Sequence, residues 1–200
     1  LVVRGHLDPV LAALQPDWIL RSFVEQTRFS GFYEGMKRLM DVVGGMVGFL
    51  VFAILFPPIA LAIILDDGLP VIFRQQRLGK NGKAYEIIKY RTWANDRSSV
   101  TRVGRFLRKS HLDELPQVIN ILRGEMSLVG PRAEQLELVE EYQDQIPFYR
   151  ARLLVKPGLT GWAQVNQNYA ANVEETAVKL ELDLHYIKHR TLLLDIIILL

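Results

Sequence analysis

The sequence contains no cysteine, and this absence excludes several kinds of chemistry at once. A chain without cysteine has no disulfide, no thiolate metal site and no cysteine nucleophile. Net charge is also small, formally +2 over 200 residues, so overall charge gives no reason to expect nucleic acid as a partner. The sequence further lacks a Walker phosphate loop, a His-Glu-x-x-His zinc pair and a serine nucleophile motif. Carboxylates and cations are left as the groups that could carry chemistry.

Hydrophobic residues are plentiful, at 50% of the chain, and the length suits one domain with an appendage. The sequence begins with Leu1 and ends within an apolar run at 196–200, so we expect a fragment of a longer protein. Residues 1–36 lack the basic start and apolar stretch of a signal peptide. We therefore expect them to form a tail or linker from a missing upstream region.

Residues 42–65 form an uncharged run of about 24 residues, long enough to cross the hydrocarbon core of a membrane as a helix. Pro57 and Pro58 interrupt this run, and proline in a helix interior removes a backbone donor and clashes with the preceding turn. Basic residues flank the run on both sides, and positive flanks mark the cytoplasmic face. Both ends of the uncharged run are therefore predicted to lie on the same side of the membrane.

A re-entrant helix over residues 37–70, bent at the prolines, satisfies both observations. A kinked transmembrane span and a buried core helix are the alternatives. We expect Asp41, just inside the entry of this helix, to pair locally with Lys37 and Arg38.

Two β-branched and aromatic runs, at 71–76 and 84–90, flank the sequence GKNG at 79–82, which is typical of a β-hairpin. Lys89 and Arg91 lie two residues apart, so on a strand they share a face and could bind one anion. A solvated hairpin face explains the same spacing.

Residues 100–109 are expected to form a short helix on which Arg102, Arg105 and Arg108 share one face. Such a stripe fits a solvated face, a face on anionic lipid or a diphosphate clamp.

Two adjacent carboxylates, Asp113 and Glu114, follow within the sequence LDELPQ at 112–117. The simplest interpretation is structural, with Ser110 or Asp113 capping a helix over 114–122. In the functional interpretation the same helix start attracts an anion. Adjacent helical residues point about 100° apart, so the two carboxylates cannot act as an equivalent pair and should have distinct roles.

Two later motifs suit ligand binding. Residues 126–132 (MSLVGPR) place Arg132 after a Gly-Pro turn, where its guanidinium could hold phosphate oxygens bidentately. Residues 156–166 (KPGLTGWAQVN) form a glycine-punctuated loop. An ordinary Gly-Pro turn with a surface arginine is the alternative for the first pattern, and a tight turn explains the second equally well. Residues 183–200 are expected to form an interfacial helix.

Five of these motifs, in this order from about Lys37 to the C-terminus, resemble the bacterial sugar transferase family, the monotopic polyprenyl-phosphate glycosyl-1-phosphate transferases. The resemblance implies an α+β fold, a mostly helical catalytic domain with a small β-hairpin, a Pro-bent re-entrant membrane helix and interfacial amphipathic helices. Residues 71–200 would be the catalytic region.

The resemblance also implies roles for single residues. Asp113 would be the nucleophile, and Glu114 would assist the metal site or proton handling. Substrate-binding cations would be Lys89, Arg91, Arg108 and Arg132. Magnesium is the expected metal, held by Asp113 together with substrate phosphates.

The implied reaction transfers a sugar 1-phosphate from a UDP-sugar to polyprenyl phosphate, through a covalent Asp113 intermediate. It would begin exopolysaccharide or other glycan synthesis at the bacterial inner membrane, with the catalytic part facing the cytoplasm. Membrane lipids would be further partners, and a homo-oligomer is left open. Two alternatives remain open, a non-catalytic scaffold of a polysaccharide assembly system and a nucleotide-sugar hydrolase.

Overall fold

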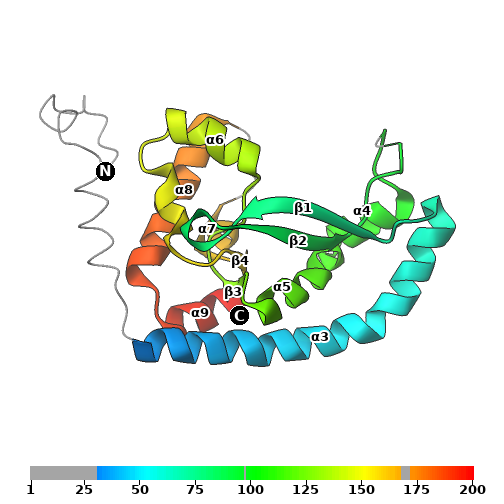
Figure 1. Cartoon of the computed structure of the whole chain (residues 1–200), viewed down its shortest axis with the longest axis horizontal. Coiled ribbons are helices and arrows are strands. Elements are labelled where there is room, and N and C mark those ends of the chain that lie inside the picture. Colours follow the sequence, from blue (N-terminus) through cyan, green and yellow to red (C-terminus); the bar gives the residue numbers. More distant parts are fainter. Residues whose placement is uncertain (1–30, 97, 168–171) are drawn as a thin grey trace, which may run out of the picture.

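A computed structural model describes residues 31–96, 98–167 and 172–200 of the chain. Most of the expected tail, residues 1–30, lies outside the described residues. The described part is mostly helical, with one antiparallel β-hairpin and one short pair of parallel strands (Figure 1). The expectation of a mostly helical fold with a small hairpin is confirmed.

The longest element is helix α3, Gly31–Asp67, which contains Pro57 and Pro58. Figure 1 shows one continuous helix that runs beneath the body of the molecule and then bends upward along its side. The proline pair gives a physical reason for the bend, because each proline removes a donor from the helical hydrogen-bond ladder.

Both halves of α3 pack against the same body. In the first half, a Cβ on Gly48 would lie 2.8 Å from Val118 Cγ1, so glycine at this position permits a close approach to helix α5, Val118–Arg123. In the second half, Ile63 packs in a buried cluster with Tyr90 and Leu107. The helix therefore follows the surface of the body along its whole length.

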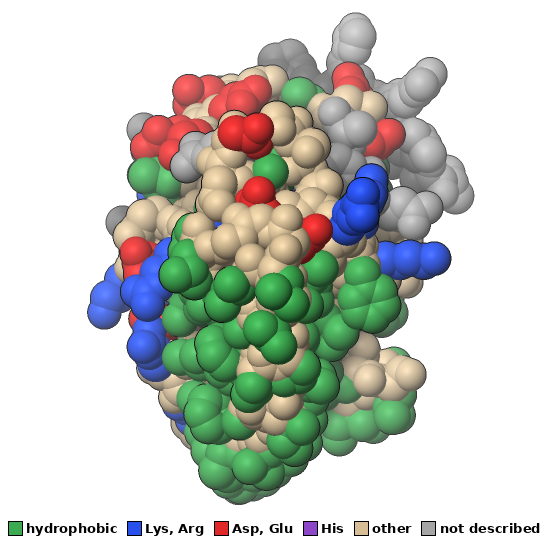
Figure 2. Space-filling view, turned by 90° about the vertical axis from the view of Figure 1, so that its right-hand side faces the viewer, with side chains coloured by type: hydrophobic (Ala, Val, Ile, Leu, Met, Phe, Trp, Pro, Cys, Tyr) green, Lys and Arg blue, Asp and Glu red, His purple; other side chains and the backbone are tan. Residues whose placement is uncertain are grey.

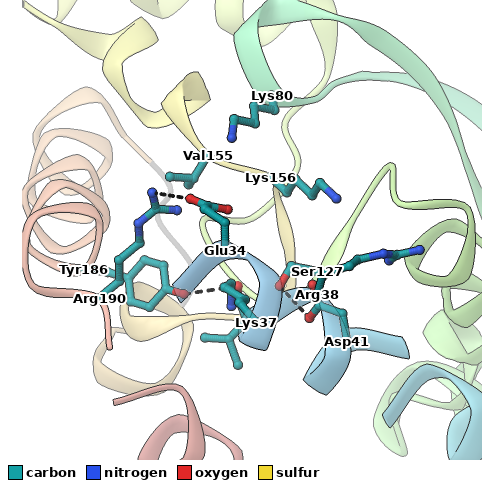
Figure 3. A pocket seen from close by; sticks show the side chains of 11 residues that line it. Glu34, Lys37, Arg38, Asp41, Lys80, Ser127, Val155, Lys156, Tyr186 and Arg190 are labelled. Atoms are coloured by element: carbon teal, nitrogen blue, oxygen red, sulfur yellow. Dashed lines mark hydrogen bonds and ion pairs between the residues drawn. The ribbon is translucent and has the colours of Figure 1, made fainter. Parts of the chain in front are cut away.

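Polar contacts fix the first half of α3. Lys37 forms a buried ion pair with Asp195 at 2.8 Å, and Arg38 donates to the carbonyls of Ile121 and Leu122 at 2.7 Å each. The expected pairing of Asp41 with Lys37 and Arg38 is wrong, because both cations bind elsewhere. Asp41 instead accepts hydrogen bonds from Ser127 Oγ and from the Leu128 amide (Figure 3).

The predicted hairpin is confirmed. Strands β1, Ile72–Leu78, and β2, Ala84–Tyr90, pair antiparallel with Ile72 opposite Tyr90. They are joined by the turn η1, Lys80–Gly82. Asn81 and Gly82 have φ of 58° and 73°, a left-handed conformation that asparagine and glycine tolerate best, which is why the Asn-Gly sequence marks the turn.

The remaining elements are short. Between β2 and the second strand pair lie α4, Arg102–Lys109, and the 3₁₀ helix η2, Leu112–Gln117. After α5 come β3, Ser127–Val129, α6, Leu136–Gln145, and η3, Tyr149–Leu154. The chain then forms β4, Gly158–Thr160, α7, Trp162–Asn166, α8, Val173–His189, and α9, Leu192–Leu199.

The expected helix at 114–122 is thus a 3₁₀ helix followed by a short α-helix. The expected interfacial helix at 183–200 falls on two helices. Thr191 separates them, because its side chain accepts a hydrogen bond from the Leu194 amide and starts α9.

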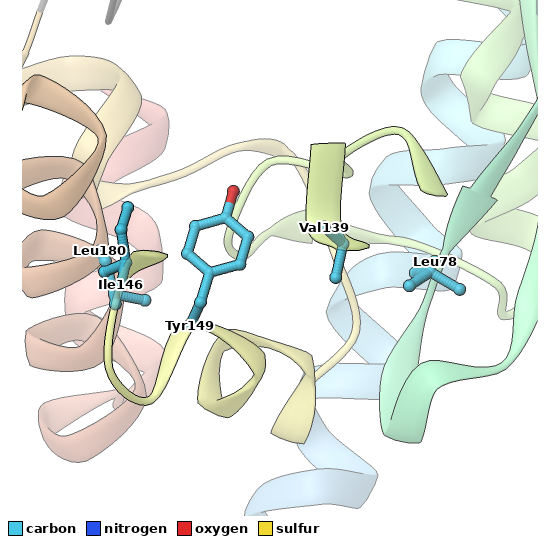
Figure 4. Close-up of a cluster of buried hydrophobic side chains, with 5 residues drawn as sticks. All are labelled: Leu78, Val139, Ile146, Tyr149 and Leu180. Atoms are coloured by element: carbon cyan, nitrogen blue, oxygen red, sulfur yellow. The ribbon is translucent and has the colours of Figure 1, made fainter. Parts of the chain in front are cut away.

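One buried cluster ties the hairpin to the helices above it. It contains Leu78, Val139, Ile146, Tyr149 and Leu180, from β1, α6, η3, α8 and the segment between α6 and η3 (Figure 4). Deep burial of these side chains gives the hydrophobic stabilisation that holds these elements in place.

Strands β3 and β4 pair in parallel and bring two distant motifs together. Ser127 lies opposite Gly158, and Val129 lies opposite Thr160. The Gly130 amide donates to the Thr160 carbonyl at 2.9 Å, and the Gly158 amide donates to the Pro131 carbonyl at 2.9 Å. The turn that carries Arg132 is therefore held by the glycine-punctuated loop.

Gly158→Ala is expected to destabilise the protein by about 2–3 kcal/mol. Its Cβ would lie 2.1 Å from the Gly130 nitrogen and 2.3 Å from the Thr160 oxygen, and backbone atoms cannot move aside as a flexible side chain can. Gly35→Ala is the matched control, because a Cβ there meets no atom within 4 Å. Thermal unfolding in one detergent would measure both, and equal melting temperatures would contradict the packing.

Within the described part of the chain, α3 is the one helix long and apolar enough to cross a membrane by length and composition. Its outer face carries exposed large apolar side chains. Among them are Leu50, Ile54 and Leu65, which are 65%, 74% and 78% exposed. Figure 2 shows hydrophobic side chains gathered over the lower part of the molecule. An apolar surface of this kind is typical of contact with lipid or another protein.

Candidate active site

Two cationic side chains from separate parts of the chain meet at the carboxylate of Glu114. Glu114 lies on η2, Lys89 lies near the end of β2, and Arg132 follows β3. Lys89 Nζ and Arg132 Nη2 both donate to Glu114 Oε1, at 2.8 and 2.7 Å. The predicted association of Lys89, Glu114 and Arg132 is therefore present in the fold.

The two cations determine the charge of Glu114. Burial by itself would raise the pKa of this carboxyl, but the charges of Arg132 and Lys89 and their hydrogen bonds outweigh it and hold the pKa at about 2. Glu114 is therefore ionised at neutral pH, and its Oε1 accepts hydrogen bonds from both cations.

Asp113 lies in a different environment from its neighbour. Among the residues that the structure describes, no other side chain donates a hydrogen bond to its carboxylate or pairs with it. Burial and the charge of Glu114 raise the pKa of Asp113, while Lys89 and Arg108 partly offset that increase. Glu114 is thus bound by two cations, whereas Asp113 has no side-chain partner in the described part of the chain. This difference is consistent with distinct roles for the two carboxylates.

The capping explanation for these residues does not hold. Ser110 Oγ donates backward to the Phe106 carbonyl at 2.9 Å instead of capping the next helix. The residue before η2 is His111, in a left-handed conformation, and no side chain caps either η2 or α5. Asp113 therefore does not cap either helix.

Arg108 projects from the last turn of α4. Its Nε donates to Thr92 Oγ1 at 3.0 Å, and its guanidinium lies over the Trp93 ring at 5.1 Å from the ring centroid. These contacts orient the side chain, and its charge acts on Asp113. Arg102 and Arg105 lie exposed on the same helix.

Arg91 does not join this group. It directly follows the last residue of β2. Its guanidinium pairs with Asp67 and donates to the carbonyls of Gly68 and Pro70. The structure thus brings Arg91 to the end of α3 and not to Lys89, and its observed contacts are structural.

Two residues near the site were missed by the sequence analysis. Arg77 and Gln117 line a cavity together with Lys89, Glu114 and Arg132, and its empty volume is about 250 Å³. Gln117 was noted only as part of LDELPQ, and Arg77 was given no role. No spacing rule predicts that a strand residue and a helix residue 40 positions apart face one cavity.

A buried ionic network lies behind Arg132 and was also missed. Arg152 pairs with Asp183 at 2.7 Å and with Glu134 at 3.2 Å, and it donates to the Arg132 carbonyl at 3.1 Å. Lys179 completes the network at 2.6 Å from Glu134. The network fixes the backbone that carries Arg132.

The carboxylates of the site determine whether magnesium could bind there. Within residues 31–96, 98–167 and 172–200, no three His, Asp or Glu residues gather as a metal site. Magnesium, however, is commonly held by one or two carboxylates plus substrate phosphates. The free oxygens of Asp113 suit that arrangement, whereas Glu114 is already bound by cations.

Known proteins are similar to this chain over most of its length. The family model described as "Bacterial sugar transferase" matches residues 32–200. The chain is 40% identical over 181 residues to the UDP-N-acetylgalactosamine-undecaprenyl-phosphate N-acetylgalactosaminephosphotransferase of Aeromonas hydrophila, covering 84% of this chain and 43% of that protein.

Two glucose-1-phosphate transferases are similar as well. The UDP-glucose:undecaprenyl-phosphate glucose-1-phosphate transferase of Escherichia coli K12 is 40% identical over 85% of this chain and 40% of its own length. Its namesake from Caulobacter vibrioides is 41% identical over 82% of this chain and 67% of its own length. The chain thus spans about two fifths of the first two relatives. With its family model matched from near the start of α3 to the last residue, the chain belongs to the bacterial sugar transferase family.

Proposed function

We propose that this chain transfers a sugar 1-phosphate from a UDP-sugar to undecaprenyl phosphate. The observation that carries the proposal is the free Asp113 carboxylate beside a Glu114 engaged by Lys89 and Arg132. The names of the three relatives support UDP as the nucleotide and undecaprenyl phosphate as the acceptor. Those names differ in the sugar, N-acetylgalactosamine or glucose, so they leave the sugar open.

In the first step, an Asp113 oxygen attacks the β-phosphorus of the UDP-sugar. The phosphoanhydride bond breaks, UMP leaves with the bonding electrons, and the sugar phosphate is joined to Asp113 as an acyl phosphate. Lys89 and Arg132 neutralise negative charge on the diphosphate, which is the main task of a phosphoryl-transfer site. Magnesium bound by Asp113 and the diphosphate would add to this neutralisation.

In the second step, a phosphate oxygen of undecaprenyl phosphate attacks the same phosphorus. The acyl-phosphate bond breaks and the Asp113 carboxylate is restored. One phosphoanhydride bond is broken and one is made, so no further energy source is needed. A covalent intermediate of this kind leads to ping-pong kinetics.

Glu114 has a separate part in this scheme. In the free site its carboxylate holds Lys89 and Arg132 2.8 and 2.7 Å away. An incoming diphosphate competes with Glu114 for the same two cations. Glu114 therefore keeps the cations in position before the donor binds.

The packing of α3 supports a re-entrant membrane helix. Lys37 and Arg38 near its start bind Asp195 and the end of α5. At its other end Asp66 accepts from the Val103 amide at 2.9 Å, and Asp67 pairs with Arg91. A helix that spanned a bilayer would have these ends on opposite sides, yet both contact one body. Its exposed apolar middle would enter one leaflet and return.

This placement brings a soluble donor and a lipid acceptor to one site. The basic residues that flank the apolar run favour the cytoplasmic face of a bacterial inner membrane. Arg102, Arg105 and the exposed Phe106 of α4 would lie near the lipid headgroups.

The experiment is a transfer assay with the purified chain in nanodiscs, magnesium, a panel of UDP-sugars and undecaprenyl phosphate. Mass spectrometry would detect undecaprenyl-diphosphate-sugar as the product. Continuous UMP release without acceptor would identify a hydrolase, whereas a transferase would release at most one UMP per protein. Absence of both products from every donor would favour the scaffold.

A further inference from the structure

Two residues that line the cavity beside Glu114 each carry a buried side-chain donor without a partner among the described residues. Gln117 Nε2 and Arg77 Nε are both buried and make no hydrogen bond. Gln117 as a whole is only 2% exposed. An unsatisfied buried donor costs about 1–3 kcal/mol, so such groups usually have a reason to persist.

The charge of the cavity indicates what could satisfy these donors. Its wall carries three cations, Arg77, Lys89 and Arg132, and the single carboxylate of Glu114. A ligand with negative charge and several acceptor oxygens fits that balance, and a phosphate group has both properties. The empty space of about 250 Å³ between these residues includes open solvent, so a phosphate group would enter it from the solvent side.

The guanidinium of Arg77 is held in place by its other nitrogens. Nη1 donates to the Ala133 carbonyl at 3.3 Å, and Nη2 donates to Gln75 Oε1 at 2.8 Å. The side chain is therefore fixed beside the Arg132 turn before any ligand arrives. Preorganised donors of this kind bind without a large loss of side-chain entropy.

We propose that Gln117 and Arg77 form the inner wall of a phosphate subsite, in which Gln117 Nε2 donates to a phosphate oxygen of the nucleotide-sugar donor. This inference rests on the proposed function. It adds two residues to Lys89 and Arg132 as residues that bind the nucleotide sugar. Gln117 is a specificity residue here, since it distinguishes a phosphate from a phosphate-free nucleoside.

Two substitutions at one position test the proposal. Gln117→Leu keeps the size and removes the donor, and Gln117→Glu keeps the shape but is ionised and can only accept. Calorimetry with UMP measures binding without a reactive anhydride. The Leu variant is expected to weaken UMP binding about tenfold, and the Glu variant about 100-fold through added charge repulsion.

A second readout separates ligand binding from a structural role. Gln117→Leu removes an unsatisfied buried group, so its melting temperature should equal or exceed that of the wild type while UMP binding falls. Uridine binding should change less than twofold. Gln143→Leu, on the outer side of α6, is the control and should leave UMP binding unchanged.

The outcomes distinguish this inference from the proposed function. If the wild type forms the lipid-linked product and Gln117→Leu binds UMP as the wild type does, the subsite is wrong and the proposed function stands. A buried water would then satisfy the amide. If the wild type neither forms product nor binds UMP, both are overturned.

Discussion

Asp113→Asn is expected to abolish sugar-phosphate transfer, with kcat lowered about 10⁴-fold or more. An amide cannot attack phosphorus as a carboxylate does, and the proposed reaction has no second nucleophile to replace it. Lys89 and Arg132 bind Glu114 and hold its pKa at about 2, so its carboxylate is a weaker nucleophile than that of Asp113 and does not replace it. The loss should appear in kcat and not in the binding of UMP.

Stability provides the control for this variant. The Asp113 carboxylate has no side-chain partner in the described part of the chain, so the melting temperature should remain within about 2 °C of the wild type. Asp144→Asn, at an exposed position on α6, should leave both activity and stability unchanged. Turnover retained by Asp113→Asn would refute the nucleophile assignment.

Arg152→Leu is expected to destabilise the protein by about 3–5 kcal/mol. Arg152 is 3% exposed and binds Asp183 and Glu134 together, so its removal leaves two carboxylates at a buried site, of which Glu134 keeps its ion pair with Lys179. An uncompensated buried charge costs far more than a lost surface contact. Urea denaturation of the protein in detergent would measure the change.

Arg150→Leu is a matched control two positions away. Arg150 is exposed and donates to Gln143 on the surface, so its loss should change stability by less than about 0.5 kcal/mol. Equal effects of the two substitutions would contradict the view that a buried ionic network supports the Arg132 turn.

Local sequence signals predicted the elements that depend on neighbouring residues. The hairpin followed from Asn81 and Gly82, because their left-handed conformations are encoded at the turn itself. The proline pair in α3 predicted a bend for the same reason. The separate environments of Asp113 and Glu114 followed from the angle between adjacent helical residues.

Contacts between distant segments could not be predicted in this way. The parallel pairing of β3 with β4 joins residues about 30 positions apart, and no periodicity in the sequence predicts this pairing. Arg91 was expected to share a face with Lys89, but it lies beyond the strand and Asp67 binds it. The Arg152 network depends on α8, η3 and Glu134 meeting in three dimensions.

The covalent mechanism is tested by the intact mass of the nanodisc-embedded protein after incubation with magnesium and a UDP-sugar, without undecaprenyl phosphate. We expect an added mass of one sugar phosphate that maps to Asp113, is absent from Asp113→Asn and disappears when undecaprenyl phosphate is added. Product formation by the wild type with no adduct on any residue, including under rapid acid quench, would contradict the covalent mechanism and indicate a single-step transfer.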